Sequence, residues 1–134
     1  MKRLFSTSWI SSKQPRKQIK YRANAPLHKK HKFLSANLSK ELRKKYGKRS
    51  LPLRKGDDVL IIRGSFSKKT GKISSVNLKR SRIFIEGITR TKKDGAKVNI
   101  SLHPSNLQIN SLSLDDKERV NSLERKSISH SKKS

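Results

Sequence analysis

The stretch KGDDVLIIRGSFSKKTGKI, residues 55–73, contains the densest apolar run of a chain that is otherwise dominated by lysine and arginine. Its four consecutive aliphatic residues, Val59–Ile62, lie between Gly56 and Gly64, and a third glycine follows at Gly71. A short run that is apolar on both faces is typical of a strand at the centre of a small barrel. Glycines at the ends of such a run allow tight turns and close approach of neighbouring backbones. We therefore expect a central strand at Val59–Ile62 and a second strand that begins near Gly71.

The composition limits the size of the core and indicates the kind of partner. The chain has 134 residues, of which 31% are hydrophobic, so it has room for one small core with tails. Its formal net charge is +26, from 35 Lys and Arg against 9 Asp and Glu. Sixteen of the basic residues, but a single acid, fall in residues 1–50. A charge this one-sided opposes compaction, and a polyanion such as nucleic acid relieves it by releasing condensed counterions.

Cysteine content and hydropathy exclude several classes of protein. The sequence contains no cysteine, which excludes a disulfide framework and a thiolate metal site. No stretch approaches the roughly 20 apolar residues of a membrane span. The start, MKRLFSTSWISSK (1–13), is basic, rich in serine and free of acids. Mitochondrial transit peptides and basic tails share that composition, and we favour a basic tail.

The second half of the chain has the two-residue period of half-buried strands. Apolar and polar residues alternate over 83–86, 98–103 and 107–110, and residues 71–78 form another strand-like segment. The Asp-Gly pair at 94–95 suits a hairpin turn, because these residue types tolerate positive φ. About five short, closely spaced strands predict a mainly β fold, a small closed or partly open barrel.

Helices are expected before the barrel, in the basic part of the chain. The clearest is KELRKKY (40–46), with Ser39 as its N-cap and Gly47 as its end. A second short helix is expected over 27–34, directly after a proline.

A further helix is expected after the barrel. The segment SLDDKERVNSLERK (113–126) has the pattern of an amphipathic helix, with Ser113 as the expected N-cap and Asp116 at the capping-box position. The sequence thus predicts three parts: a basic N-terminal extension with short helices (1–50), a barrel (51–112), and a C-terminal helix with a polar tail (113–134).

The sequence lacks the residue patterns of catalysis and metal binding. His28 and His31 could share a helix face, but the lysines around them oppose a divalent cation. Asp57 and Asp58 are adjacent, so on a strand they point to opposite faces and cannot act as a pair. No nucleophile elbow, P-loop or dinucleotide fingerprint occurs. We therefore expect no enzyme activity, no catalytic residue, no metal site and no cofactor.

Two basic clusters near the barrel are candidates for phosphate contact. One is the loop after the central strand, where a rigid scaffold restricts the chain, and it carries Lys68, Lys69 and Lys72. A solvated lysine loop is the alternative. The other cluster is the segment 77–93, which begins with Lys79, Arg80 and Arg82. Arginine can bridge phosphates bidentately and can stack on bases.

The opening stretch, with its glycines and the sequence Gly71-Lys72-Ile73, resembles a KOW motif, which occurs in ribosomal proteins and in transcription elongation factors. Five further segments extend the resemblance: SKQPRKQ (12–18), NAPLH (24–28), LSKELRKKYGKRSLPLRKGD (38–57), LKRSRIFIEG (78–87) and HPSN (103–106). With them, residues 12–126 resemble the archaeal and eukaryotic form of the large-subunit ribosomal protein of the universal L-twenty-four family. The sequence departs from the family pattern at Ser67-Lys68, where a glycine is usual, and at the strand 98–102.

The resemblance implies an SH3-like barrel that is a structural constituent of the large ribosomal subunit. It implies binding to the 5′ domain of large-subunit rRNA, a role in early subunit assembly and a position near the polypeptide exit tunnel. The implied location is cytoplasmic, and the implied partners are rRNA and neighbouring ribosomal proteins, with no membrane, no small-molecule substrate and no homo-oligomer. Together with the loop residues Lys68 and Lys69, the residues expected to contact RNA are Lys13, Arg16, Lys17, Asn24, His28, Lys55, Lys72, Lys79, Arg80, Arg82, His103, Ser105 and Asn106.

Two other functions stay open on the sequence alone. A transcription elongation accessory module would use a KOW barrel to bind RNA polymerase, and a cationic protein could condense DNA or attack membranes. The basic extension argues against the first, and an ordered barrel is unnecessary for the second. In the ribosomal interpretation we expect residues 1–37 to be largely disordered without RNA, because they contain few apolar residues to order them.

Overall fold

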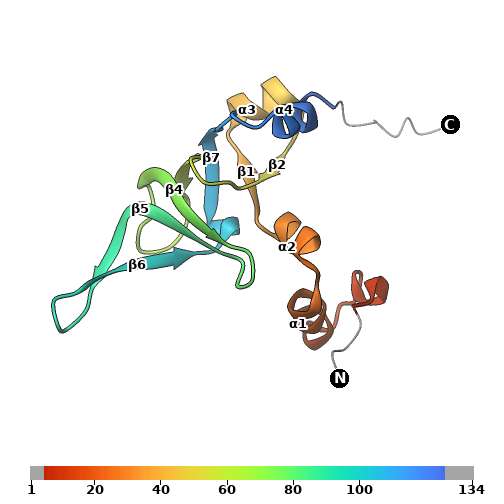
Figure 1. Cartoon of the computed structure of the whole chain (residues 1–134), viewed down its shortest axis with the longest axis horizontal. Coiled ribbons are helices and arrows are strands. Elements are labelled where there is room, and N and C mark those ends of the chain that lie inside the picture. Colours follow the sequence, from red (N-terminus) through yellow and green to blue (C-terminus); the bar gives the residue numbers. More distant parts are fainter. Residues whose placement is uncertain (1–4, 126–134) are drawn as a thin grey trace.

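A computed structural model describes residues 5–125 and shows a mainly β protein built on one mixed sheet (Figure 1). Its strands are β1 (Ser35–Leu38), β2 (Ser50–Pro52), β3 (Asp58–Ile61), β4 (Thr70–Asn77), β5 (Arg82–Thr91), β6 (Lys97–Leu102) and β7 (Leu107–Ser111). They run in the order β2-β1-β7-β3-β4-β5-β6, and only the β1–β7 pair is parallel among the pairs described. β2 and β6 form the two edges, so the barrel-like sheet is not closed. The expected mainly β fold with N-terminal helices and a C-terminal helix is confirmed.

The helices lie at the two ends of β1. The described helical elements are η1 (Thr7–Trp9), α1 (Pro15–Asn24), α2 (Leu27–Phe33), α3 (Lys40–Tyr46), η2 (Pro104–Asn106) and α4 (Lys117–Glu124). Figure 1 shows α1 and α2 standing away from the sheet on the N-terminal side of β1, with α3 and α4 at its other end. We call the segment from η1 to α2, residues 7–33, the arm; none of its lysine and arginine residues is buried.

The core forms from the alternating residues of the strands. Val59 and Ile61 of β3 are buried, at 0% and 1% exposure, whereas Ile62 is 41% exposed. The central strand therefore buries one face only, although its sequence is apolar on both. Ile83 and Ile85 of β5 are buried as their alternation predicts. β3 lies between β7 and β4, which confirms its central place.

Gly71 permits a close approach of two strands. A Cβ atom at this position would lie 2.7 Å from Cγ2 of the buried Ile85 and 3.1 Å from the carbonyl oxygen of Glu86. A side chain there would force β4 away from β5, which is the reason the sequence needs glycine at the start of β4.

β1 has no counterpart among the strands expected from sequence. It pairs antiparallel with β2 and parallel with β7, and Leu34, Ala36 and Leu38 are buried. These residues are part of the core, and the residues before them form α1 and α2 around the buried Tyr21. The expectation of disorder therefore does not fit residues 5–37, which the structure shows as ordered elements. The division of the chain at residues 50 and 112 stays a prediction, but a fragment that begins at residue 51 would lack β1.

The short helices in the N-terminal part follow their local signals. The expected helix over 40–46 is α3: the Ser39 hydroxyl accepts a hydrogen bond from the Leu42 N–H, and Gly47 ends the helix at φ 63°. The helix expected over 27–34 is α2, one residue shorter. The ten-residue α1 was not expected, although it begins with a proline, a residue suited to the first helical turn.

The C-terminal helix begins later than the sequence predicts. Asp116, not Ser113, is the N-cap of α4, and its carboxylate accepts a hydrogen bond from the Glu118 N–H at 2.9 Å. Ser113 instead donates its hydroxyl to Asp115 at 2.7 Å and its N–H to Asp57 at 3.1 Å, and its carbonyl accepts from Arg119 at 2.8 Å. The last residue of the expected helix and the polar tail lie outside the described residues.

A buried ion pair fastens α4 to the barrel. Arg119 donates two hydrogen bonds to the two carboxylate oxygens of Asp57, at 2.6 and 2.7 Å, and the side chains are 4% and 0% exposed. Asp57 and Arg119 are 62 residues apart in the sequence. Each also makes further hydrogen bonds, Asp57 with the Arg54 N–H at 2.9 Å and Arg119 with the carbonyl oxygens of Ser113 and Pro52. Because the pairing satisfies both carboxylate oxygens, it fixes where the helix lies.

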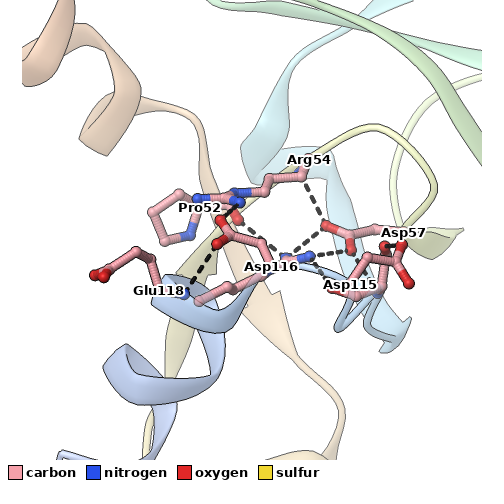
Figure 2. A network of polar contacts seen from close by, with 8 residues as sticks. Pro52, Arg54, Asp57, Asp115, Asp116 and Glu118 are labelled. Atoms are coloured by element: carbon pink, nitrogen blue, oxygen red, sulfur yellow. Dashed lines mark hydrogen bonds and ion pairs between the residues drawn. The ribbon is translucent and has the colours of Figure 1, made fainter.

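A more exposed pair lies beside the buried one (Figure 2). The Arg54 guanidinium donates to the Asp116 carboxylate, and this hydrogen bond is the main cause that holds the pKa of Asp116 below its usual value. The Glu118 N–H lowers the same pKa further. Asp116 therefore stays ionised at neutral pH, where it both caps α4 and faces Arg54.

Candidate nucleic-acid interface

A pocket of about 320 Å³ lies where three separate parts of the chain meet. We call it the junction pocket, and it is lined by Arg22, Ala23, Phe33, Lys79, Arg80, Ser81, Arg82 and His103. These residues come from the α1–α2 arm, from the turn between β4 and β5, and from the residue before η2. Four of them carry a fixed positive charge, and none of the lining residues is acidic. The junction pocket is therefore a concave cationic surface formed by the arm and the barrel together.

The turn between β4 and β5 presents its basic residues in a fixed conformation. The Asn77 side-chain oxygen accepts a hydrogen bond from the Arg80 N–H, three residues further on, at 3.0 Å, which is the kind of contact an N-cap makes. Ser81 adopts a left-handed conformation at φ 52°, and Asn77 is paired with Arg82 across the two strands. Lys79 and Arg80 thus stand on a short turn that is closed by both side-chain and strand contacts.

His103 is held so that one ring nitrogen faces away from its own turn. Its Nδ1 accepts a hydrogen bond from the Ser105 N–H at 3.3 Å and lies 2.6 Å from the Ser105 hydroxyl. Burial lowers the pKa of His103, and the charges of Arg82 and Arg22 lower it further. The imidazole is therefore neutral at pH 7. Because Nδ1 accepts from a backbone N–H, the proton of the neutral ring belongs on Nε2.

Arg22 reaches the pocket because the arm has a small core of its own. Tyr21 is 5% exposed and packs against Phe5 and Phe33, with ring centroids 5.1 and 5.9 Å away. The Gln18 side chain donates to the carbonyl oxygens of the residues that precede α1, at 2.8 to 3.2 Å. These contacts orient α1, so that Arg22 and Ala23 at its end line the junction pocket.

The structure brings together only part of the residues expected to contact RNA. Lys79, Arg80, Arg82 and His103 line the junction pocket. Ser105 and Asn106 lie next to it in η2, where Ser105 contacts His103. The arm carries Arg16, Lys17 and Asn24 in α1 and His28 in α2, with Lys13 just before α1. Lys55, Lys68, Lys69 and Lys72 lie on the barrel, around β3 and its loop to β4.

Arg22 and Phe33 are the residues of the junction pocket that sequence reasoning missed. Arg22 lies two residues before the segment NAPLH (24–28) and was not singled out, whereas Phe33 was noted only as one of the aromatic residues in the basic extension. The useful signal was local: Pro15 can begin a helix, no glycine follows it before Pro26, and α1 (Pro15–Asn24) occupies this segment. Recognition of that helix would have placed Arg22 at its C-terminal end.

The lysine loop between β3 and β4 is closed by its backbone. Lys68 has φ 70°, a left-handed conformation that favours glycine, and its N–H donates to the Ile61 carbonyl at 2.8 Å. Ser67 and Lys68 are the two positions where the sequence departs from the pattern it resembles, and Lys68 adopts the conformation that glycine favours. The Lys69 ammonium lies 5.4 Å from the centroid of the Phe66 ring. The two lysines are therefore displayed from an ordered loop.

A second pocket, of about 580 Å³, lies on the barrel between the arm and β4. It is lined by His31, Leu53, Arg54, Lys55, Ser74, Ser75, Val76 and Leu78. Burial lowers the pKa of His31, and the charges of Arg54 and Arg119 lower it further. His31 is thus surrounded by cations rather than by metal ligands. Among residues 5–125, no group of three or more His, Asp or Glu residues is placed to hold a metal ion.

The described helices are short and polar. Within residues 5–125, none is long and apolar enough to cross a membrane.

Comparison with known proteins gives one consistent result. The family described as ribosomal proteins L26 (eukaryotic) and L24 (archaeal) matches residues 12–126. The chain is 46% identical over 115 residues to the large ribosomal subunit protein uL24 of Methanosphaera stadtmanae, a match that covers 86% of this chain and 98% of the relative. It is also 46% identical over 119 residues to the uL24 protein of Korarchaeum cryptofilum, which covers 89% of this chain and 91% of the relative.

Proposed function

Because the chain belongs to the family of eukaryotic L26 and archaeal L24 ribosomal proteins, we propose that it binds the 5′ domain of large-subunit rRNA and supports early subunit assembly near the polypeptide exit tunnel. The family is one of structural proteins, so the chain is a structural protein of the large ribosomal subunit and not an enzyme. Its location would be the cytoplasmic ribosome, and its partners would be rRNA and neighbouring ribosomal proteins.

The observation that carries the RNA proposal is the convergence of separate cationic elements on the junction pocket. Arg22 comes from the arm, and Arg80 and Arg82 come from the barrel, yet they line one concavity without an acidic neighbour. Placing such charges together costs free energy in the absence of a counterion, and phosphates remove that cost. The guanidinium group also binds phosphate oxygens bidentately. The pocket therefore suits a folded RNA whose backbone turns between the arm and the barrel.

The proposed mechanism is charge neutralisation combined with recognition of RNA shape. The barrel supplies a rigid platform, with a buried core and turns closed by hydrogen bonds such as the one from Arg80 to Asn77. The arm carries further lysine and arginine residues on α1 and α2, away from the barrel. Two RNA segments that are distant in sequence would thus be held at a fixed angle, one by the barrel and one by the arm. Such contacts recognise the shape of folded RNA more than its base sequence.

The residues expected to contact RNA take their place in this proposal as three groups. The junction pocket would receive the RNA backbone at the turn, the arm from Lys13 to His28 would follow a groove, and the β3–β4 loop would add phosphate contacts through Lys68 and Lys69. The alternative of an elongation accessory module bound to RNA polymerase is less well supported, because both relatives named here are ribosomal.

Sedimentation tests the proposed assembly. A tagged chain in cell extract is expected to remain with the large subunit on a sucrose gradient after a wash at about 0.5 M salt, where the Debye length falls to about 4 Å. Weak surface contacts should be largely screened under these conditions. Release from ribosomes together with recovery on RNA polymerase or chromatin would contradict the proposal and support the alternative.

A further inference from the structure

We propose that the junction pocket takes a single unstacked nucleotide of RNA, with its base against Phe33 and its phosphate between Arg22 and Arg82. This inference rests on the proposed RNA-binding function and names the ligand of the same site. It differs from general backbone binding, because it requires a base to leave its stack and enter the protein.

The size of the pocket exceeds what a phosphate needs. Its volume of about 320 Å³ equals the space of roughly ten water molecules, at about 30 Å³ each. A phosphate group alone would fill a small part of that space, whereas a nucleotide with its sugar and base would fill most of it. Small residues on two walls, Ala23 and Ser81, leave the centre open.

The two guanidinium groups come to the pocket from two different elements. Arg22 belongs to α1 and Arg82 to β5, and both act on His103, since the charge of each lowers its pKa. The imidazole therefore lies within the field of both arginines. An anionic group placed among the three residues would be attracted by both charges, and a phosphate offers oxygens to each guanidinium.

His103 supplies a donor for a neutral group. Its Nδ1 is occupied by the Ser105 N–H, so the neutral ring presents Nε2–H. A cationic ring would only add to the charge of the pocket, but a neutral one can donate to a ribose hydroxyl or to a base acceptor. Readout of the 2′-hydroxyl is how proteins distinguish RNA from DNA.

Phe33 supplies an apolar wall in an otherwise cationic pocket. It is the last residue of α2, is half-buried, and is supported by the buried Tyr21, at 5.9 Å between ring centroids. Unstacked bases in RNA complexes commonly lie on aromatic side chains, and such stacking tolerates any base. Phe33 thus makes two kinds of contact: it packs on Tyr21 within the arm, and its remaining surface lines the pocket, where a base can stack on it.

The test compares nucleotides with ligands that lack a base. The full chain, isotope-labelled for NMR, is titrated with AMP, with CMP, with ribose 5-phosphate and with inorganic phosphate. We expect both nucleotides to shift the ring signals of Phe33 and His103, and to bind about fivefold or more tightly than ribose 5-phosphate. Equal affinity for nucleotides and ribose 5-phosphate would overturn the inference.

Variants of Phe33 separate stacking from charge. Phe33→Leu should abolish the preference for nucleotides and Phe33→Tyr should keep it, while the matched Phe84→Leu, on β5 outside the pocket lining, should leave it unchanged. If Phe33→Leu disturbs the Tyr21 signals, Arg22→Gln is used in its place. Arg22→Gln should lower the affinity for nucleotides and for ribose 5-phosphate by the same factor, so that the ratio of the two affinities is kept. A preference that survives Phe33→Leu in a folded protein would also overturn the inference.

The same proteins distinguish this inference from the proposed function. A transcript of the 5′ domain of archaeal large-subunit rRNA is the second probe. If the wild-type chain binds the transcript but shows no preference for nucleotides, the proposed RNA binding is supported and the inference of a nucleotide pocket is wrong. If the chain does not bind the transcript above the level of an unrelated RNA, the proposed function falls as well.

Discussion

Arg119→Met is expected to lower the free energy of unfolding by about 3–5 kcal/mol, because it leaves the Asp57 carboxylate buried without its charge partner. Asp57 is fully buried and receives two hydrogen bonds from Arg119, at 2.6 and 2.7 Å. The backbone donors that remain, from Arg54 and Ser113, cannot balance a full charge removed from water. Urea unfolding followed by far-UV circular dichroism measures the loss.

The partner variants show whether the charge is the cause. Arg54→Met removes the solvent-exposed pair with Asp116 and is expected to cost far less than Arg119→Met, because water and salt screen an exposed pair. The double variant Asp57→Leu with Arg119→Met removes both charges, and it should recover much of the stability lost in Arg119→Met alone. Equal losses in Arg119→Met and Arg54→Met would contradict the assignment of this buried pair as the main attachment of α4.

The second large effect is expected from reversal of charge at the junction pocket. Lys79→Glu with Arg80→Glu should weaken binding to the 5′-domain transcript by at least about tenfold. The plot of log affinity against log salt concentration has a negative slope, and its magnitude should fall by about 0.9 for each phosphate that the protein no longer neutralises. Both side chains are exposed and lie on the turn that Asn77 closes, so the fold should tolerate the change. Filter binding at several salt concentrations gives both quantities.

A matched variant separates position from net charge. Lys44→Glu with Lys45→Glu changes the net charge by the same amount on α3, which lies at the other end of β1 from the arm (Figure 1). It should reduce affinity much less than the pocket variant does. Equal reductions from both variants would mean that RNA responds to the overall charge of the chain and not to the junction pocket.

Local signals explain which elements could be predicted from the sequence. α3 carries its own N-cap at Ser39 and its own end at Gly47, so seven residues contain all the information needed. In β5 and β7 the alternation of apolar and polar residues likewise predicts which face of the strand is buried. β1 could not be found in this way: it has four residues, and its pairing with β7 joins positions as far apart as Leu38 and Ile109.

The site was predictable in its residue types but not in its assembly. Lys79, Arg80, Arg82 and His103 line one pocket, and their contact with RNA stays a prediction. Their convergence with Arg22 depends on how the arm packs, through Tyr21 and Phe33, which no local pattern reveals. The partnership of Asp57 with Arg119 was hidden for the same reason, since it links the start of β3 to α4. In both cases tertiary contact, not local sequence, decides the role of the residue.

Directed cleavage of rRNA tests the central claim, that the junction pocket faces the 5′ domain of large-subunit rRNA. The chain has no cysteine, so Ala23→Cys creates a single attachment point for an iron–EDTA probe at the pocket, and Ser122→Cys creates one on α4 as the control. After incorporation into large subunits, the Ala23→Cys probe should cut a compact set of nucleotides in the 5′ domain that the Ser122→Cys probe leaves intact. Cleavage confined to other domains, or none above that of the untethered reagent, would contradict the account.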